Sequence, residues 1–124
     1  MNKTAPLADL SSLVDVFERM RGLAVWIIGD IMLDEYFIGE VVRISPEAPV
    51  PILRVCEVEQ RLGGAANVAV QIAALGAHAS LAGLVGQDLA GTQILQMCEQ
   101  SRIDVRAVCK LDDRPSTRKL RALA

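Results

Sequence analysis

The stretch GGAANVAVQIAALG, residues 63–76, decides the fold class that this sequence predicts. Two glycines open it, and only Asn67 and Gln71 interrupt the apolar residues that follow as far as Leu75. The run is too long for a single strand and is rich in alanine, so it predicts a buried helix that ends at Gly76. Paired glycines before a helix permit positive φ and let a ligand approach the backbone closely, so the start of this helix is a candidate binding loop.

Short apolar runs on both sides of this helix predict buried strands. LAVWIIG at 23–29 is typical of a central strand that ends in glycine, and Ser80–Val85 predicts a second buried strand. A helix is expected at 89–100, with Asp88 as its N-cap. Two further strands are expected at Val105–Leu111 and Thr117–Leu123. Strands that alternate with helices predict an α/β fold built on a parallel sheet.

The remaining segments predict one more helix and a flap. Residues 7–20 carry apolar side chains at helical spacing, which predicts an amphipathic helix. Residues 36–43 and 50–58 are rich in Val, Ile, Tyr and Phe, which favours strands. The prolines of Ser45–Pro51 cannot donate to a sheet ladder, so these strands are expected at an edge or in a separate small flap.

The composition fits a protein with a buried core and argues against several classes. Hydrophobic residues make up 52% of the chain and aromatic residues only 3%, which disfavours base-stacking platforms for nucleic acid. The apolar run Leu23–Ile28 is far too short to span a bilayer, so no membrane partner is expected. His78 is the only histidine, and we expect it on the surface at the start of a strand, so neither a histidine-based metal site nor a Ser-His-Asp triad is expected within this chain. The three cysteines lack CxxC spacing, and no secretory signal precedes them, so we expect reduced thiols in the cytoplasm.

Charge is distributed unevenly along the chain. The net charge is −2, yet residues 101–124 carry seven basic side chains against three acidic ones. This segment fits either a solvated, salt-bridged edge or a site for a small anion.

Two loops carry candidate chemistry. Asp30 and Asp34 follow the first buried strand, and ligands of open α/β sheets bind beyond the carboxyl ends of the strands. Their carboxylates can each accept two hydrogen bonds from adjacent sugar hydroxyls, although ordinary solvated loop acids are the simpler interpretation. Asn67, in the first turn after Gly63-Gly64, offers a donor and an acceptor, and the alternative is a buried side chain bonded to backbone.

The motif Gly63-Gly64-Ala65-Ala66-Asn67-Val68-Ala69, followed by Gly76 and Gly86, resembles the N-terminal signature of the ribokinase-type (phosphofructokinase B) sugar kinases. Three further stretches, Gly29–Tyr36, Arg43–Pro51 and Pro115–Arg121, resemble the members that phosphorylate D-glycero-β-D-manno-heptose 7-phosphate for ADP-heptose and lipopolysaccharide synthesis. Those kinases occur alone or fused to an adenylyltransferase. The resemblance runs from Val25 to Leu123.

The resemblance implies a ribokinase-like Rossmann-type sheet with a small β lid, of which residues 1–124 form the N-terminal portion. It gives the lid segments as about 36–58 and 107–123. It assigns sugar hydroxyls to Asp34, Asn67 and the backbone of Gly63 and Gly64. We further expect Lys119 and Arg121, with Thr117, to bind the distal phosphate of the sugar, because residues two apart in a strand share a face. Arg118 is expected to point away.

The resemblance also implies ATP and Mg²⁺ as cofactors, phosphoryl transfer to O1 and pairing of two chains through the lid. The family's catalytic Asp, in a Gly-Ala-Gly-Asp loop, has no counterpart in this sequence, so the chain alone is predicted to be inactive. Two alternatives remain open. One is another sugar or nucleoside kinase of the same family, and the other is a non-catalytic sugar-binding module.

Overall fold

The computed structural model describes residues 10–124. Its helices are α1 (Leu10–Met20), α2 (Ala65–Ala74) and α3 (Leu89–Gln100). Its strands are β1 (Ala24–Ile28), β2 (Ile31–Ile44), β3 (Pro51–Gly64), β4 (His78–Gly86), β5 (Asp104–Leu111) and β6 (Thr117–Leu123). The predicted helix at 89–100 and the predicted final strand at 117–123 are confirmed. Residues 7–9 of the predicted first helix lie outside the described residues.

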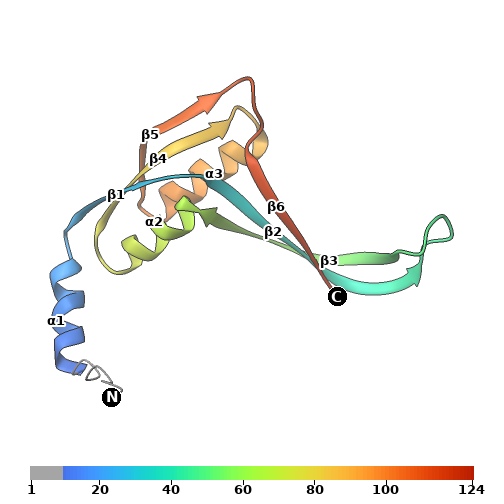
Figure 1. Cartoon of the computed structure of the whole chain (residues 1–124), viewed down its shortest axis with the longest axis horizontal. Helices are drawn as coiled ribbons and strands as arrows, with labels where there is room; N and C mark the ends of the chain where they lie inside the picture. Colours follow the sequence, from blue (N-terminus) through green and yellow to red (C-terminus); the bar gives the residue numbers. More distant parts are fainter. Residues whose placement is uncertain (1–9) are drawn as a thin grey trace, which may run out of the picture.

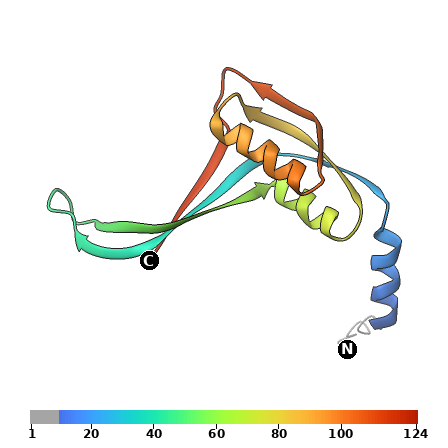
Figure 2. The ribbon, with the colours of Figure 1, turned by 180° about the vertical axis from the view of Figure 1, so that it is seen from behind.

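The strands form two sheets. A parallel sheet has the order β1-β4-β5, and a second sheet, which we call the lid sheet, has the order β3-β2-β6. Within the lid sheet β2 and β3 are antiparallel, whereas β2 and β6 are parallel. Helices α2 and α3 lie beside the parallel sheet, while the far ends of β2 and β3 project away from it (Figure 1). The same division into a compact body and a projecting lid is seen from behind in Figure 2.

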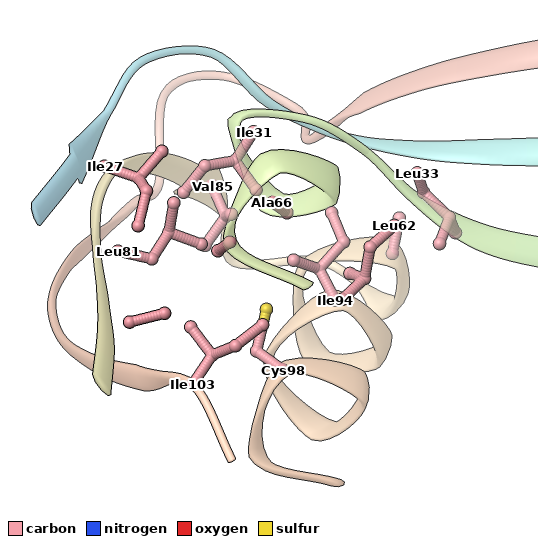
Figure 3. Close-up of a cluster of buried hydrophobic side chains, with 13 residues drawn as sticks. Ile27, Ile31, Leu33, Leu62, Ala66, Leu81, Val85, Ile94, Cys98 and Ile103 are labelled. Carbon is pink, nitrogen blue, oxygen red and sulfur yellow. The ribbon is translucent and has the colours of Figure 1, made fainter. Parts of the chain in front are cut away.

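One hydrophobic cluster joins the parallel sheet, helices α2 and α3, and the base of the lid sheet (Figure 3). Leu81 and Val85 of β4 meet Ile94 of α3, and all three are at most 1% exposed. Leu33 of β2 and Leu62 of β3 enter the same cluster. Because these lid residues are part of the core, the base of the lid is fixed to the body.

The structure corrects the expected lid segments. Residues 107–111 belong to β5, which pairs with β4 in the parallel sheet, so only the 117–123 part of the expected segment 107–123 joins the lid sheet. The strands β2 and β3 are also longer than expected, since they begin at Ile31 and end at Gly64. The segment 30–34 is therefore mostly strand rather than loop.

The first strand also differs from its prediction. In the described chain β1 is an edge strand and β4 is the central one. Ile27 is buried, but Trp26 is 62% and Ile28 79% exposed. The apolar run of β1 therefore covers the core with one face and presents apolar side chains on the other. His78 lies at the start of β4 and is exposed, as expected. None of the helices in residues 10–124 has the length and apolarity needed to cross a membrane.

Candidate functional site

Alternation along β2 gives the lid sheet two different faces. Leu33 and Glu35 are buried toward the body, while Met32, Asp34 and Tyr36 lie on the opposite face and are half-buried. The register with β3 and β6 places two rows of three side chains on this second face. The first row is Arg61, Asp34 and Lys119, and the second is Glu59, Tyr36 and Arg121. We call these six residues the Asp34 face.

Asp34 and Arg121, both predicted as site residues, are in direct contact on this face. Arg121 Nη1 donates to Asp34 Oδ1 at 3.0 Å, and the Asp34 side chain is only 18% exposed. The guanidinium of Arg121 also lies over the Tyr36 ring, with its Cζ atom 4.9 Å from the ring centroid. A ligand on this face would therefore meet a carboxylate and a guanidinium already held in place.

Strand β6 divides its polar residues between the two faces. Thr117, Lys119 and Arg121 are opposite Met32, Asp34 and Tyr36 of β2, respectively, so they share one face as predicted. Lys119 is exposed, and we find no hydrogen bond or ion pair for it within residues 10–124.

Arg118 points to the other face, also as predicted, and forms an ion pair there. Its guanidinium donates to Glu35 Oε2 at 2.7 Å, and Glu35 is 4% exposed. Gln60 Nε2 donates to Glu35 Oε1 at 2.9 Å, so both oxygens of this buried carboxylate are bonded in a partly buried polar network behind the Asp34 face.

The glycine pair lies where β3 passes into α2. A Cβ atom on Gly63 would lie 2.8 Å from Asp34 Oδ2 and 2.7 Å from Met32 Cγ, so the carboxylate packs directly against this backbone. Gly64 has a φ of 57°, which only glycine adopts easily. The first amide of α2, on Ala65, donates to the Asp30 carbonyl at 2.8 Å, and no side chain caps the helix.

Asn67 and Asp30 are not brought against Asp34. Asn67 is exposed in the first turn of α2 and lines a cavity of about 320 Å³ with residues of β3 and α3. Arg61 lines this cavity as well, so it is Arg61 that connects the Asn67 cavity with the Asp34 face. Asp30 lines a different cavity, of about 210 Å³, with Arg114 and Thr117.

Arg61 and Tyr36 are site residues that the sequence reasoning did not assign. The Cζ atom of Arg61 lies 5.1 Å from the Tyr36 centroid, and its Nη2 donates to Glu59 Oε2 at 2.6 Å. This hydrogen bond to Glu59 and the negative charge of its carboxylate raise the pKa of Arg61 above its usual value. Extending the predicted strand 50–58 to the glycine pair would have placed Arg61 and Gly63 on one face, because residues two apart alternate together.

Asp88 caps α3, as expected, and also forms hydrogen bonds with the turn before β6. Asp88 Oδ1 accepts from the Gly91 amide at 2.7 Å and from Ser116 Oγ at 2.7 Å, and its Oδ2 accepts from the Ser116 amide at 2.8 Å. These bonds, led by the Ser116 hydroxyl, lower the pKa of Asp88. Through these bonds Asp88 ties the start of α3 to the turn that precedes β6.

The acidic side chains of residues 10–124 do not gather into a metal-ligand cluster. Within 10–124 no group of three or more His, Cys, Asp or Glu side chains is arranged to hold a metal ion. The acids nearest the Asp34 face are bound by Arg121 and Arg61. We therefore assign none of these residues to ATP or its metal.

Comparison with known proteins shows the family of this chain. The family model described as pfkB family carbohydrate kinase matches residues 24–124. The D-beta-D-heptose 7-phosphate kinase of Bordetella bronchiseptica is 49% identical over 106 residues, which cover 86% of this chain and 34% of that protein. The bifunctional protein HldE of Haemophilus influenzae is 49% identical over 100 residues, covering 81% of this chain and 21% of that protein. The chain thus spans about a third or less of these relatives.

Solved structures share the fold. The aminoimidazole riboside kinase of Salmonella enterica, in complex with aminoimidazole riboside and an ATP analog, matches with a TM-score of 0.59 and 26% identity over 78% of this chain and 28% of that one. The fructokinase of Halothermothrix orenii matches with a TM-score of 0.61 and 25% identity over 81% of this chain and 34% of that one. The α/β architecture with a parallel sheet is therefore that of the ribokinase-type kinases, and the chain belongs to the pfkB family of carbohydrate kinases.

Proposed function

We propose that this chain is the acceptor-binding part of an ATP-dependent kinase that phosphorylates D-glycero-β-D-manno-heptose 7-phosphate at O1 in ADP-heptose synthesis. The observation that carries the proposal is the Asp34 face, where a carboxylate for hydroxyl groups lies beside Arg121 and Lys119. A sugar phosphate needs both kinds of group at once. The 49% identity to the D-beta-D-heptose 7-phosphate kinase of Bordetella bronchiseptica supports this sugar over others.

Roles for the chain's own residues follow from their placement. Asp34 would accept hydrogen bonds from sugar hydroxyls, and the backbone of Gly63 and Gly64 would allow the sugar to approach closely. Asn67 would reach the same sugar across the Arg61 side chain. Lys119 and Arg121, with Thr117, would hold the distal phosphate, since an Arg fork suits phosphate oxygens. These contacts would orient the acceptor hydroxyl, which is a large part of phosphoryl-transfer catalysis.

ATP would supply the phosphoryl group, with Mg²⁺ on its phosphates. The chain alone would bind the acceptor without turning over ATP, because its sequence has no counterpart of the family's catalytic Asp. The free thiols of Cys56, Cys98 and Cys109 support a cytoplasmic enzyme.

The phosphate role is tested by calorimetry with heptose 7-phosphate and with unphosphorylated heptose. Arg121→Ala should weaken binding of the phosphate form by about 1.5–3 kcal/mol more than that of heptose. Arg106→Ala is a matched control, because Arg106 is an exposed arginine of β5 paired with Asp104. Equal weakening for both sugars would show that Arg121 does not serve the phosphate.

A second candidate is another kinase of the same family, with a different sugar or nucleoside as acceptor. The aminoimidazole riboside kinase and the fructokinase share the fold of this chain, and this match favours the second candidate. A panel of heptose 7-phosphate, fructose and ribosides would separate the two. A non-catalytic sugar-binding module is the third candidate. Such a module would bind the same sugars in calorimetry, but it would not phosphorylate them even when joined to the rest of a kinase.

We also propose that two chains pair through the lid. Its projecting part exposes several apolar side chains, and a lone surface of this kind favours association. These residues are 45–60% exposed and include Val41, Val42, Ile44, Val50, Val55 and Val58. A second copy, with the same lid, is the partner that fits them.

A further inference from the structure

Tyr36 lies between two guanidinium groups from the two neighbouring strands. Arg61 comes from β3 and Arg121 from β6, on opposite sides of β2, and their Cζ atoms are 5.1 and 4.9 Å from the ring centroid. A guanidinium that rests its face on an aromatic ring keeps its N–H edge free for other partners. The Tyr36 ring therefore holds the N–H edges of both arginines close together on the Asp34 face.

The charges of the Asp34 face leave it with an excess of one cation. Arg61, Lys119 and Arg121 are positive, whereas Asp34 and Glu59 are negative. Each of the two arginines donates to one carboxylate, and each has further N–H groups available, because a guanidinium carries five. The Glu59–Arg61 pair is also exposed, at 36% and 65% of the two side chains, and exposed pairs exchange partners at little cost.

We propose that Arg61, held against Tyr36, is a third cation of the distal phosphate site and a determinant of selectivity for phosphorylated sugars. The inference rests on the proposed function and deepens it. Arg61 is opposite Asp34 in the β-ladder and also lines the cavity of Asn67, so it reaches both parts of the predicted sugar site. An anionic substituent bound there would take the free edge of Arg61 while the sugar hydroxyls meet Asp34.

The lid offers a matched control for Arg61. Arg54 is another arginine of β3 and forms a similar exposed pair, with Glu40 at 3.2 Å, and its side chain is 66% exposed against 65% for Arg61. It lies toward the far end of the lid, opposite Glu40 rather than opposite Asp34. Loss of Arg54 removes one surface charge and one ion pair without touching the Asp34 face.

The experiment compares Arg61→Ala, Arg61→Lys, Tyr36→Leu and Arg54→Ala in the 124-residue chain. The same variants are made in a chimera in which residues 24–124 replace the matching segment of the Bordetella bronchiseptica relative. Calorimetry measures the Kd for heptose 7-phosphate and for heptose, and thermal melts check that each variant folds. We expect Arg61→Ala to weaken heptose 7-phosphate binding about tenfold or more, with heptose unchanged. Tyr36→Leu should give part of that loss, Arg61→Lys an intermediate loss, and Arg54→Ala none.

The experiment distinguishes a failure of the Arg61 assignment from a failure of the proposed function. If folded wild-type protein binds heptose 7-phosphate but Arg61→Ala keeps its preference over heptose, the assignment of Arg61 is wrong and the proposed function stands. An equal loss for both sugars would also overturn the assignment, because Arg61 would then act on the sugar or on the fold. If the folded wild-type chimera binds neither sugar, the proposed function and this inference fall together.

Discussion

At the scale of single residues, the carboxylate of Asp88 accepts hydrogen bonds from three donors. Two come from Ser116 and one from Gly91, so the same side chain ends the turn before β6 and begins α3. Ser116 is buried, and its hydroxyl also accepts from the Gly86 amide at 2.9 Å. The position of Thr117, Lys119 and Arg121 therefore depends on the hydrogen bonds of Asp88 to Ser116.

Asp88→Asn should lower stability at neutral pH and flatten its acid dependence. The folded-state pKa of Asp88 is below the ordinary value of 3.8, so the stability it contributes is present above that value. The contribution is lost as pH falls through the lowered pKa. Thermal melts between neutral and strongly acidic pH should show wild type and variant converging in acid. Asp113→Asn is the control, because Asp113 is exposed in the same turn. A constant difference at all pH values would contradict this role.

Gly63→Ala should weaken sugar binding without unfolding the chain. The added Cβ would crowd Asp34 Oδ2 at 2.8 Å, so the carboxylate must move from its place beside Arg121. We expect a loss of about 1.5–3 kcal/mol in acceptor affinity, the same as for Asp34→Ala, since both remove one charged hydrogen bond. The KM for heptose 7-phosphate in the chimera measures it. An unchanged KM for Asp34→Ala would remove Asp34 from the site.

At the scale of elements, β6 is where the sequence was most informative. Alternation correctly separated Thr117, Lys119 and Arg121 from Arg118, because the two-residue period of a strand is local. Which strand pairs with which is not local. The sequence reasoning therefore placed 107–111 in the lid, whereas β5 pairs with β4.

The candidate site was predicted in part for the same reason. Asp34 and Arg121 were named separately, and their contact depends on the pairing of β2 with β6 across 87 residues of sequence. Arg61 was missed because the predicted strand stopped at Val58, although β3 continues to Gly64. Asn67 was assigned to the same sugar as Asp34, and the start of α2 places it in a cavity that Arg61 also lines.

Arg118→Ala should destabilise the fold, although Arg118 has no part in the site. It would leave Glu35, at 4% exposure, with only Gln60 as a partner, and unpaired buried carboxylates are costly. Because the Arg118 side chain is 49% exposed, we expect about 1–3 kcal/mol in urea unfolding. Lys119→Ala, one residue along, should change stability by less than about 0.5 kcal/mol. Combining Arg118→Met with Glu35→Leu should recover part of the loss, and no recovery would argue against the ion pair as its source.

At the scale of the whole molecule, the lid projects from the body (Figure 2). Its strands β2 and β3 carry exposed apolar side chains. We expect the chimera to sediment as a dimer and Val55→Lys to shift it toward monomer, because a charge would be buried between the copies. Arg54→Ala, next to it, should leave the dimer intact. A monomeric wild-type chimera at micromolar concentration would contradict pairing through the lid.

The central claim is that residues 24–124 position a heptose phosphate for phosphorylation. The most direct measurement is ATP-dependent phosphorylation of heptose 7-phosphate by the chimera with the Bordetella bronchiseptica relative, set against ribose, fructose and the 124-residue chain alone. We predict turnover with heptose 7-phosphate, loss of most of it in Arg121→Ala, far less with the other sugars, and none by the chain alone. A folded chimera that prefers another acceptor, or that shows the same activity with Arg121→Ala, would contradict the account.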